Sequence, residues 1–343
     1  MEFEKWLKTF AFGVEPGEFE FDQYKKDSFD CYCKKSPCVC KSEYLKWNEI
    51  PYAGEKEPPT NPEEPYSGSW TMYNLKRHRS LFFTKPEGEP AYFTILNPNY
   101  IDFEKQLELV LKTKEKLDPN KKTIARYWGT GVATKQWVPI IDRLIDTYHV
   151  TAPRAARILA AAHSAMNDAF VVTWYYKFLW SVARPNQYDR DLATIVCTPR
   201  HPTYPSGHAA IAGCAAEILK YYFPAESERL DELADEAALS RLYALVHFPI
   251  DNSVGLSLGK QVARVAINKL RQQTNSQGDS IDTLYTEPLG AEIPPAPYPE
   301  GQTIPFEFDL SSTSLIQKEK KEIGGRGVER RREEFRKKKD GND

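Results

Sequence analysis

The sequence predicts an all-α protein, and three observations carry this prediction. Apolar residues recur at helical spacing between residues 101 and 275, and no stretch in that range alternates in the way a half-buried strand does. Prolines interrupt the helical pattern and mark the ends of its segments. Hydrophobic residues make up 41% of the 343 residues, so the chain can bury a sizeable core.

The helical pattern begins near residue 101. Phe103, Leu107, Val110, Leu111 and Leu117 recur at the spacing of one helix face. A longer, alanine-rich helix is expected after Thr151, which can cap it, and Pro185 is expected to end it. A loop is expected over 186–205. The alanine-rich helix is expected over 151–182, and further helices are expected at 121–136, 138–149, 206–223, 226–246 and 251–273.

Four regions are expected along the chain. Residues 1–100 are rich in proline, glycine and aromatic residues, and we expect an irregular N-terminal arm that wraps over the core. Residues 101–275 would form the all-α catalytic domain, and 276–316 a proline-rich extension. Residues 317–343 carry mixed charges and few apolar side chains, a composition typical of a disordered tail.

Composition also bears on location and partners. No run of about 18 apolar residues is present, so we expect no membrane insertion. The first residues lack the basic start and apolar stretch of a signal peptide, which predicts a soluble, cytoplasmic protein. The net charge of -2 gives no general attraction to nucleic acid. Self-association into a homo-oligomer is left open.

Four of the six cysteines fall within ten residues, at Cys31, Cys33, Cys38 and Cys40. Such a cluster could hold a soft metal through thiolates, form local disulfides, or remain as free thiols. Its C-x-C-x4-C-x-C spacing differs from the usual zinc pattern.

Three short segments carry the residues suited to chemistry. In the first, Lys177 and Arg184 lie seven residues apart, which would place both cations on one side of an apolar helix. In the second, Ser206, Gly207 and His208 open a helix, where free backbone N–H groups attract an anion. Each segment also has an ordinary structural interpretation. Lys177 and Arg184 could be long side chains that extend to solvent at a helix end, and Ser206 could be a common helix cap.

The third segment contains Arg241, His247 and Asp251. His247 and Asp251 are four residues apart, so the carboxylate can fix the tautomer of the imidazole and leave its other nitrogen free. An ordinary helical pair would show the same spacing. Together the three segments supply three cations, an N–H-rich turn and two histidines, an inventory that suits an oxyanion.

The order of these segments resembles a signature shared by type 2 phosphatidic acid phosphatases, bacterial class A acid phosphatases and vanadium-dependent haloperoxidases. Three parts matching in order are more specific than any one short motif. The resemblance covers about residues 150 to 270. The matching positions are Lys177, Arg184, Pro185, Pro205, Ser206, Gly207, His208, Ser240, Arg241, His247 and Asp251.

The resemblance implies a helical-bundle core of the acid phosphatase and vanadium haloperoxidase type. It also implies an oxyanion-binding group, in which Lys177, Arg184 and Arg241 neutralise the oxygens and Ser206 and the N–H of Gly207 add hydrogen bonds.

The catalytic roles come from the same resemblance. His247 would attack phosphorus or coordinate vanadium, Asp251 would orient His247, and His208 would act as general acid. The implied cofactor is vanadate, or phosphate as bound substrate or product, and no divalent metal is required.

Two further features favour the bacterial haloperoxidase-like branch. The sequence Asp168-Ala169, followed by Trp174 and Lys177, is similar to a segment of soluble members of that branch. His201 stands where chloroperoxidases typically have Phe and bromoperoxidases His, so it could hydrogen-bond the bound oxyanion and tune halide oxidation. A loop histidine without a role is the alternative interpretation.

We therefore expect a haloperoxidase-like enzyme that oxidises halide with peroxide at a histidine-bound vanadate. The alternative is a soluble acid phosphatase that hydrolyses phosphomonoesters through a phosphohistidine intermediate. A third hypothesis, from another class, is a non-enzymatic structural or coat protein on the same fold. The expected partners are small molecules, namely peroxide and halide or a phosphate ester.

Overall fold

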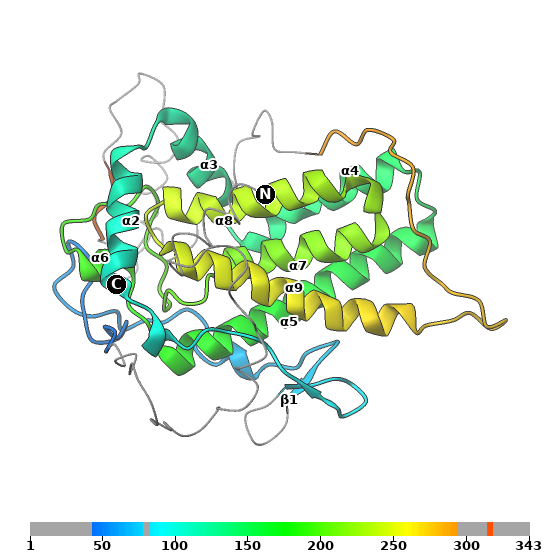
Figure 1. Cartoon of the computed structure of the whole chain (residues 1–343), viewed down its shortest axis with the longest axis horizontal. Coiled ribbons are helices and arrows are strands. Elements are labelled where there is room, and N and C mark those ends of the chain that lie inside the picture. Colours follow the sequence, from blue (N-terminus) through cyan, green and yellow to red (C-terminus); the bar gives the residue numbers. More distant parts are fainter. Residues whose placement is uncertain (1–42, 78–82, 130, 294–313, 318–343) are drawn as a thin grey trace, which may run out of the picture.

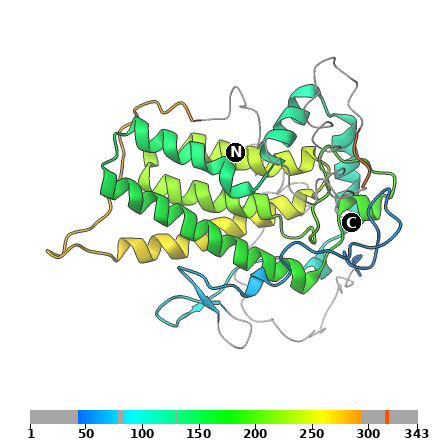
Figure 2. The same ribbon diagram turned by 180° about the vertical axis from the view of Figure 1, so that it is seen from behind.

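The computed structural model describes residues 43–77, 83–129, 131–293 and 314–317. Within these ranges the chain is mostly helical, which confirms the all-α prediction. Long helices lie side by side along the longest axis of the molecule, and the first described residues of the N-terminal arm, drawn in blue, lie at one end of them (Figure 1). Seen from behind, the longest helix follows the length of this bundle (Figure 2).

The α-helices are α2 (Phe103–Glu115), α3 (Pro119–Gly129), α4 (Val138–Thr147), α5 (Ala152–Trp180), α6 (Pro185–Tyr188), α7 (Gly207–Tyr222), α8 (Ser227–Tyr243) and α9 (Pro249–Arg271). Short 3-10 helices are η2 (Ser67–Ser69), η3 (Pro98–Tyr100), η4 (Ala133–Trp137) and η5 (Pro224–Glu226). The strands are β1 (Lys76–Arg77), β2 (Phe83–Thr84) and β3 (Pro90–Ala91).

The strands form a small antiparallel sheet in the order β1-β2-β3, with Arg77 opposite Phe83 and Phe83 opposite Ala91. The sequence gives no sign of this sheet, because strands of two residues are too short to show alternation. The sheet lies in the arm and packs on α5, since the ring of Phe83 lies 5.5 Å from that of Tyr175.

Two helices end earlier in the structure than the sequence predicts, and both ends lie near the site. The helix expected over 121–136 ends at Gly129, and a separate 3-10 turn follows. The helix expected to reach residue 182 ends at Trp180, because Ser181 adopts a left-handed conformation with φ of 51°. Arg184 therefore lies outside α5, and the prediction that Lys177 and Arg184 project from one helix is wrong.

Helix α7 is the centre of the bundle and packs against α5, α8 and α9. Its approach to α9 is close enough to require glycine. A Cβ added at Gly259 would lie 1.9 Å from the carbonyl oxygen of Ala210, and one at Gly213 would lie 2.3 Å from that of Leu256. These glycines let the two helix backbones touch, which fixes their relative position.

The same contact brings the N-termini of α7 and α9 together. The backbone N–H of Ser206 donates to the carbonyl oxygen of Asp251 over 2.9 Å. A Cβ added at Gly255 would lie 2.5 Å from the carbonyl oxygen of Ser206. The packing of two helices therefore sets the distance between two of the three predicted site segments.

The described part of the arm lies against the bundle through backbone bonds and buried aromatics. Trp47 N–H donates to the Ser181 carbonyl over 2.7 Å, and Tyr52 is fully buried. The buried carboxylate of Asp168 on α5 accepts from the N–H groups of Tyr73 and Asn74. Among the described helices, none is long and apolar enough to cross a membrane.

Replacing Gly259 with alanine tests the close packing of α7 and α9. The added methyl group would collide with the α7 backbone, which cannot move aside as a side chain can. We expect Gly259→Ala to lower the free energy of unfolding by about 1–3 kcal/mol or more. Urea denaturation followed by circular dichroism measures this loss. Ser257→Ala, on the exposed face of the same helix, is the matched control; an equal effect in both variants would refute the packing argument.

Candidate active site

All three predicted segments meet at the end of the bundle where α7 and α9 begin. Lys177 lies in the last turn of α5, and Arg184 is the residue before α6. Arg241 lies in the last turn of α8. Ser206, Gly207 and His208 lie at the start of α7, His247 lies between α8 and α9, and Asp251 lies in the first turn of α9.

Lys177 is completely buried, and backbone carbonyls hold its ammonium group. Lys177 Nζ donates to the Pro202 oxygen over 2.7 Å and to the Thr203 oxygen over 2.9 Å. Burial, followed by the charge of Arg184, lowers the pKa of Lys177, and Asp251 opposes this effect. No carboxylate bonds directly to this ammonium in the described structure, so a bound anion would be its natural counter-charge.

Arg184 is also buried, and its guanidinium connects the loop before α7 with the loop before α9. It donates to the carbonyl oxygens of His201 over 2.9 Å and of Val246 over 2.7 Å. Its Nη1 lies 3.5 Å from His247 Nε2, and its Nη2 lies 3.1 Å from His201 Nδ1. Arg184 therefore places a positive charge beside both histidines.

His247 and Asp251 form the predicted pair. His247 Nδ1 lies 3.0 Å from Asp251 Oδ2, and both side chains are buried. The carboxylate also accepts from the backbone N–H of Phe248 over 2.9 Å and from the Thr203 hydroxyl. A carboxylate at Nδ1 places the ring proton there, which leaves the lone pair of Nε2 on the side of Arg184.

The protonation of this pair follows from its surroundings. Burial, with the charges of Arg184, Lys177 and Arg241, lowers the pKa of His247, so the imidazole is neutral and keeps its lone pair. Burial raises the pKa of Asp251 to about 6, while the hydrogen bonds and the nearby cations oppose the rise. At neutral pH the carboxylate is therefore mostly ionised and can accept a hydrogen bond from His247 Nδ1–H.

Thr203 belongs to this cluster and was missed by the sequence interpretation. Its hydroxyl lies 3.1 Å from His247 Nδ1 and donates to Asp251. The two partners are 44 and 48 residues away along the chain, so no local spacing indicates the contact. Thr203 holds the carboxylate against the ring from the opposite loop.

The start of α7 supplies an N–H-rich turn and the second histidine. Ser206 caps the helix by accepting from the Ala209 N–H over 3.5 Å. His208, which is half-buried, hydrogen-bonds the backbone of Trp128, and its Nε2 has no partner among the described residues. Burial and the charges of Arg241, Lys177 and Arg184 lower the pKa of His208, so its ring is neutral.

Arg241 is buried beside Gly129, the last residue of α3. A Cβ added at Gly129 would lie 2.4 Å from Arg241 Nη1, so a side chain at this position would displace the guanidinium. Arg241 acts electrostatically on both His208 and His247. The role of Gly129 could not be predicted, because α3 lies outside the motif segments.

Positive side chains outnumber negative ones in the cluster. Three cations and one carboxylate, all buried, give a net charge of +2 when Lys177 is protonated and the histidines are neutral. A net charge of this size is costly to bury without a counter-ion. The arrangement is therefore suited chemically to an anion with several oxygen acceptors.

His201 lies at the edge of the cluster and is buried. Its ring lies 4.7 Å from that of Trp174, and Lys177 Nζ lies 5.8 Å from the Trp174 ring. Arg184 and Trp174 thus hold His201 beside the site, in the place where the resemblance expects a halide-tuning residue.

No group of three or more metal-binding side chains occurs in the described ranges. The cysteine cluster at Cys31, Cys33, Cys38 and Cys40 lies outside them, so the metal hypothesis for it stays a prediction. Cys197 and Cys214 are buried free thiols.

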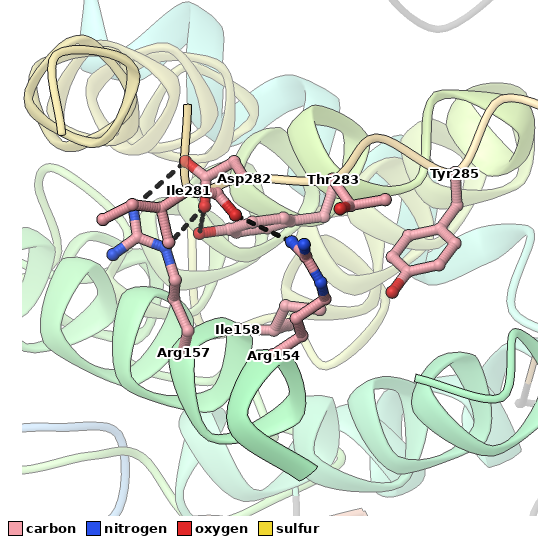
Figure 3. Close-up of a pocket in the computed structure, with 8 residues that line it drawn as sticks. Arg154, Arg157, Ile158, Ile281, Asp282, Thr283 and Tyr285 are labelled. Carbon is pink, nitrogen blue, oxygen red and sulfur yellow. Dashed lines mark hydrogen bonds and ion pairs between the residues drawn. The ribbon is translucent and has the colours of Figure 1, made fainter. Parts of the chain in front are cut away.

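A small pocket lies at the opposite end of α5 (Figure 3). Arg154 and Arg157 enter it from α5, and Asp282 enters it from the segment after α9. Arg157 pairs with the Asp282 carboxylate at 2.5 and 3.1 Å, and the pair fastens this segment to the bundle. None of the motif residues lines this pocket.

Comparison with known proteins identifies relatives of the part of the chain that contains the site. The PAP2 superfamily matches residues 157–274, a range that contains all three motif segments. A vanadium-dependent bromoperoxidase of Corallina pilulifera is 32% identical in a match that covers 24% of this chain and 18% of that relative. A bromoperoxidase of Corallina officinalis is 30% identical over the same shares.

Two solved structures share the fold. A bacterial vanadium-dependent iodoperoxidase is similar with a TM-score of 0.54 at 21% identity, over 68% of this chain and 62% of that chain. An apo-type bacterial vanadium-dependent chloroperoxidase has a TM-score of 0.50 at 14% identity, over 69% and 65%. The helical fold of this chain is thus one that vanadium-dependent haloperoxidases adopt, and the part of the chain that matches the PAP2 superfamily is residues 157–274.

Proposed function

We propose that this chain is a haloperoxidase-like enzyme that holds vanadate on His247 and oxidises halide with hydrogen peroxide. The observation that carries the proposal is the buried net charge of +2 around the lone pair of His247 Nε2. A tetrahedral oxyanion would offset part of that charge and accept hydrogen bonds from the available donors. The unpartnered Nε2 of His208 supports the same assignment, because a buried polar atom requires a partner.

In this proposal each side chain of the site has one task. Lys177, Arg184 and Arg241 would hold the oxyanion oxygens, with Ser206 and the N–H of Gly207 as further donors. His247 Nε2 would bind the central atom, while Asp251 and Thr203 keep its proton on Nδ1. When bound, vanadate would supply the Lewis acidity that activates peroxide toward halide.

The state of His208 favours the peroxidase chemistry. Its neutral ring hydrogen-bonds the Trp128 backbone and has its Nε2 available, so it can accept a proton from hydrogen peroxide. Phosphomonoester hydrolysis remains the second candidate, because the same lone pair of His247 could attack phosphorus. In that reaction His208 must first be protonated in order to donate to the leaving group.

We expect purified protein with vanadate, hydrogen peroxide and bromide to brominate a phenol dye. His247→Ala should abolish the reaction, because the vanadate ligand is lost. The change in dye absorbance measures it, and omission of vanadate or of bromide is the control. An unchanged dye together with hydrolysis of a phosphomonoester would assign the phosphatase chemistry instead.

The non-enzymatic hypothesis makes the opposite prediction for the same variant. If the protein serves as a coat or scaffold, His247→Ala should leave its cellular role intact while the fold is preserved. Loss of that role with an unchanged melting temperature would support catalysis.

Replacing Thr203 tests the support of the catalytic pair. Thr203→Val keeps the shape of the side chain but removes the hydroxyl that bonds Asp251 and His247. We expect turnover to fall about 10- to 100-fold, as for other residues that orient a ligand histidine. Thr203→Ser keeps the hydroxyl and should retain most of the activity. Equal activity in the two variants would show that the hydroxyl has no positioning role.

A further inference from the structure

Glu63 belongs to the N-terminal arm, outside the segment that matches the PAP2 superfamily, yet its backbone is fixed at the site. Its N–H donates to the carbonyl oxygen of Arg200 over 2.7 Å. Its own carbonyl oxygen accepts from Trp174 Nε1 over 3.1 Å. Arg200 immediately precedes His201, and Trp174 lies one turn before Lys177. Both anchors of Glu63 are therefore direct neighbours of site residues.

The side chain of Glu63 extends the cluster outward. Its Oε2 lies 3.9 Å from His201 Nε2, and 37% of the side chain is exposed. The distance is too long for a direct hydrogen bond, and burial lowers the pKa of His201, so the neutral ring forms no ion pair with the carboxylate. The carboxylate thus lies between the buried cluster and solvent.

His201 lies between Glu63 and the cations of the cluster. Its Nδ1 lies 3.1 Å from Arg184 Nη2 and 3.1 Å from the Pro202 carbonyl oxygen. Its other nitrogen, Nε2, is the one that faces Glu63 at 3.9 Å. One imidazole ring therefore separates the Glu63 carboxylate from the Arg184 guanidinium.

Glu63 also changes the charge of the site. The buried cluster carries +2, and the carboxylate of Glu63 lowers the sum to +1. Burial lowers the pKa of both Lys177 and Arg184, and the charge of Glu63 is among those that oppose this lowering. The carboxylate is therefore close enough to act on the cations that would hold the anion.

We propose that Glu63 is a specificity-determining residue that favours singly charged over doubly charged oxyanions at this site. The inference rests on the proposed oxyanion-binding function. It separates the two candidate chemistries, because a phosphate monoester carries nearly two negative charges at neutral pH, whereas orthovanadate is mostly a monoanion. Glu63 would thereby disfavour phosphomonoesters without closing the site.

The size of the effect depends on the charge of the ligand. Coulomb energy is proportional to that charge, so the repulsion by Glu63 of a dianion is about twice that of a monoanion. The change in affinity for a dianion should then be about the square of the change for a monoanion. For a partly exposed carboxylate we expect Glu63→Gln to tighten monoanion binding about threefold and dianion binding about tenfold.

The experiment measures the Kd of orthovanadate and of molybdate, a permanent dianion of similar size, at pH 7.5. Wild type, Glu63→Gln and Glu63→Ala are compared by calorimetry, with circular dichroism to confirm that each is folded. Glu64→Gln is the matched control, since it removes the same charge from the exposed neighbouring residue. The result expected is tighter binding in both Glu63 variants, with the larger gain for molybdate, and little change in Glu64→Gln.

Two other outcomes are distinguishable. If wild type binds the anions and the Glu63 variants match Glu64→Gln, or if both anions gain equally, Glu63 does not select by charge and only this inference falls. If wild type binds neither anion, the proposed oxyanion function falls, and the role of Glu63 falls with it.

Discussion

The contact between Asp251 and His247 is the interaction on which the rest of the site depends. The carboxylate holds the proton of the imidazole on Nδ1, and this leaves Nε2 as the lone pair beside Arg184. The contact exists because α9 begins beside α7, where the backbone of Asp251 accepts from Ser206. The glycines between α7 and α9 therefore position the His247–Asp251 pair as well as the hydrophobic core.

Charge is the second constraint, and it explains why the cluster points to an anion. Buried cations normally pair with buried carboxylates, but this cluster has three cations and one buried carboxylate. Backbone carbonyls of the loops before α7 and α9 hold Lys177 and Arg184 in place. The protein thus maintains a cationic site before any ligand arrives, which is the preorganisation that oxyanion chemistry requires.

The helical core and the motif residues could be predicted because both depend on short-range patterns. Helical spacing indicated α2, α5, α7, α8 and α9, with ends correct to within a few residues. The motif segments are each contiguous, so a sequence comparison detects them without knowledge of the fold. Their convergence at one end of the bundle is what the structure adds.

The parts that could not be predicted depend on contacts between distant segments. Thr203 bonds Asp251 across 48 residues, and Glu63 reaches His201 from the arm. The left-handed Ser181, which separates Arg184 from α5, gave no signal, since serine has no preference for that conformation. The cysteine cluster lies outside the described residues, and its chemistry stays a prediction.

A crystal structure of the protein soaked with orthovanadate tests the central claim most directly. The account predicts vanadium bonded to His247 Nε2, with its oxygens held by Lys177, Arg184 and Arg241. Vanadate bound away from His247, or a His247 ring whose Nε2 instead bonds to protein groups after the soak, would contradict it.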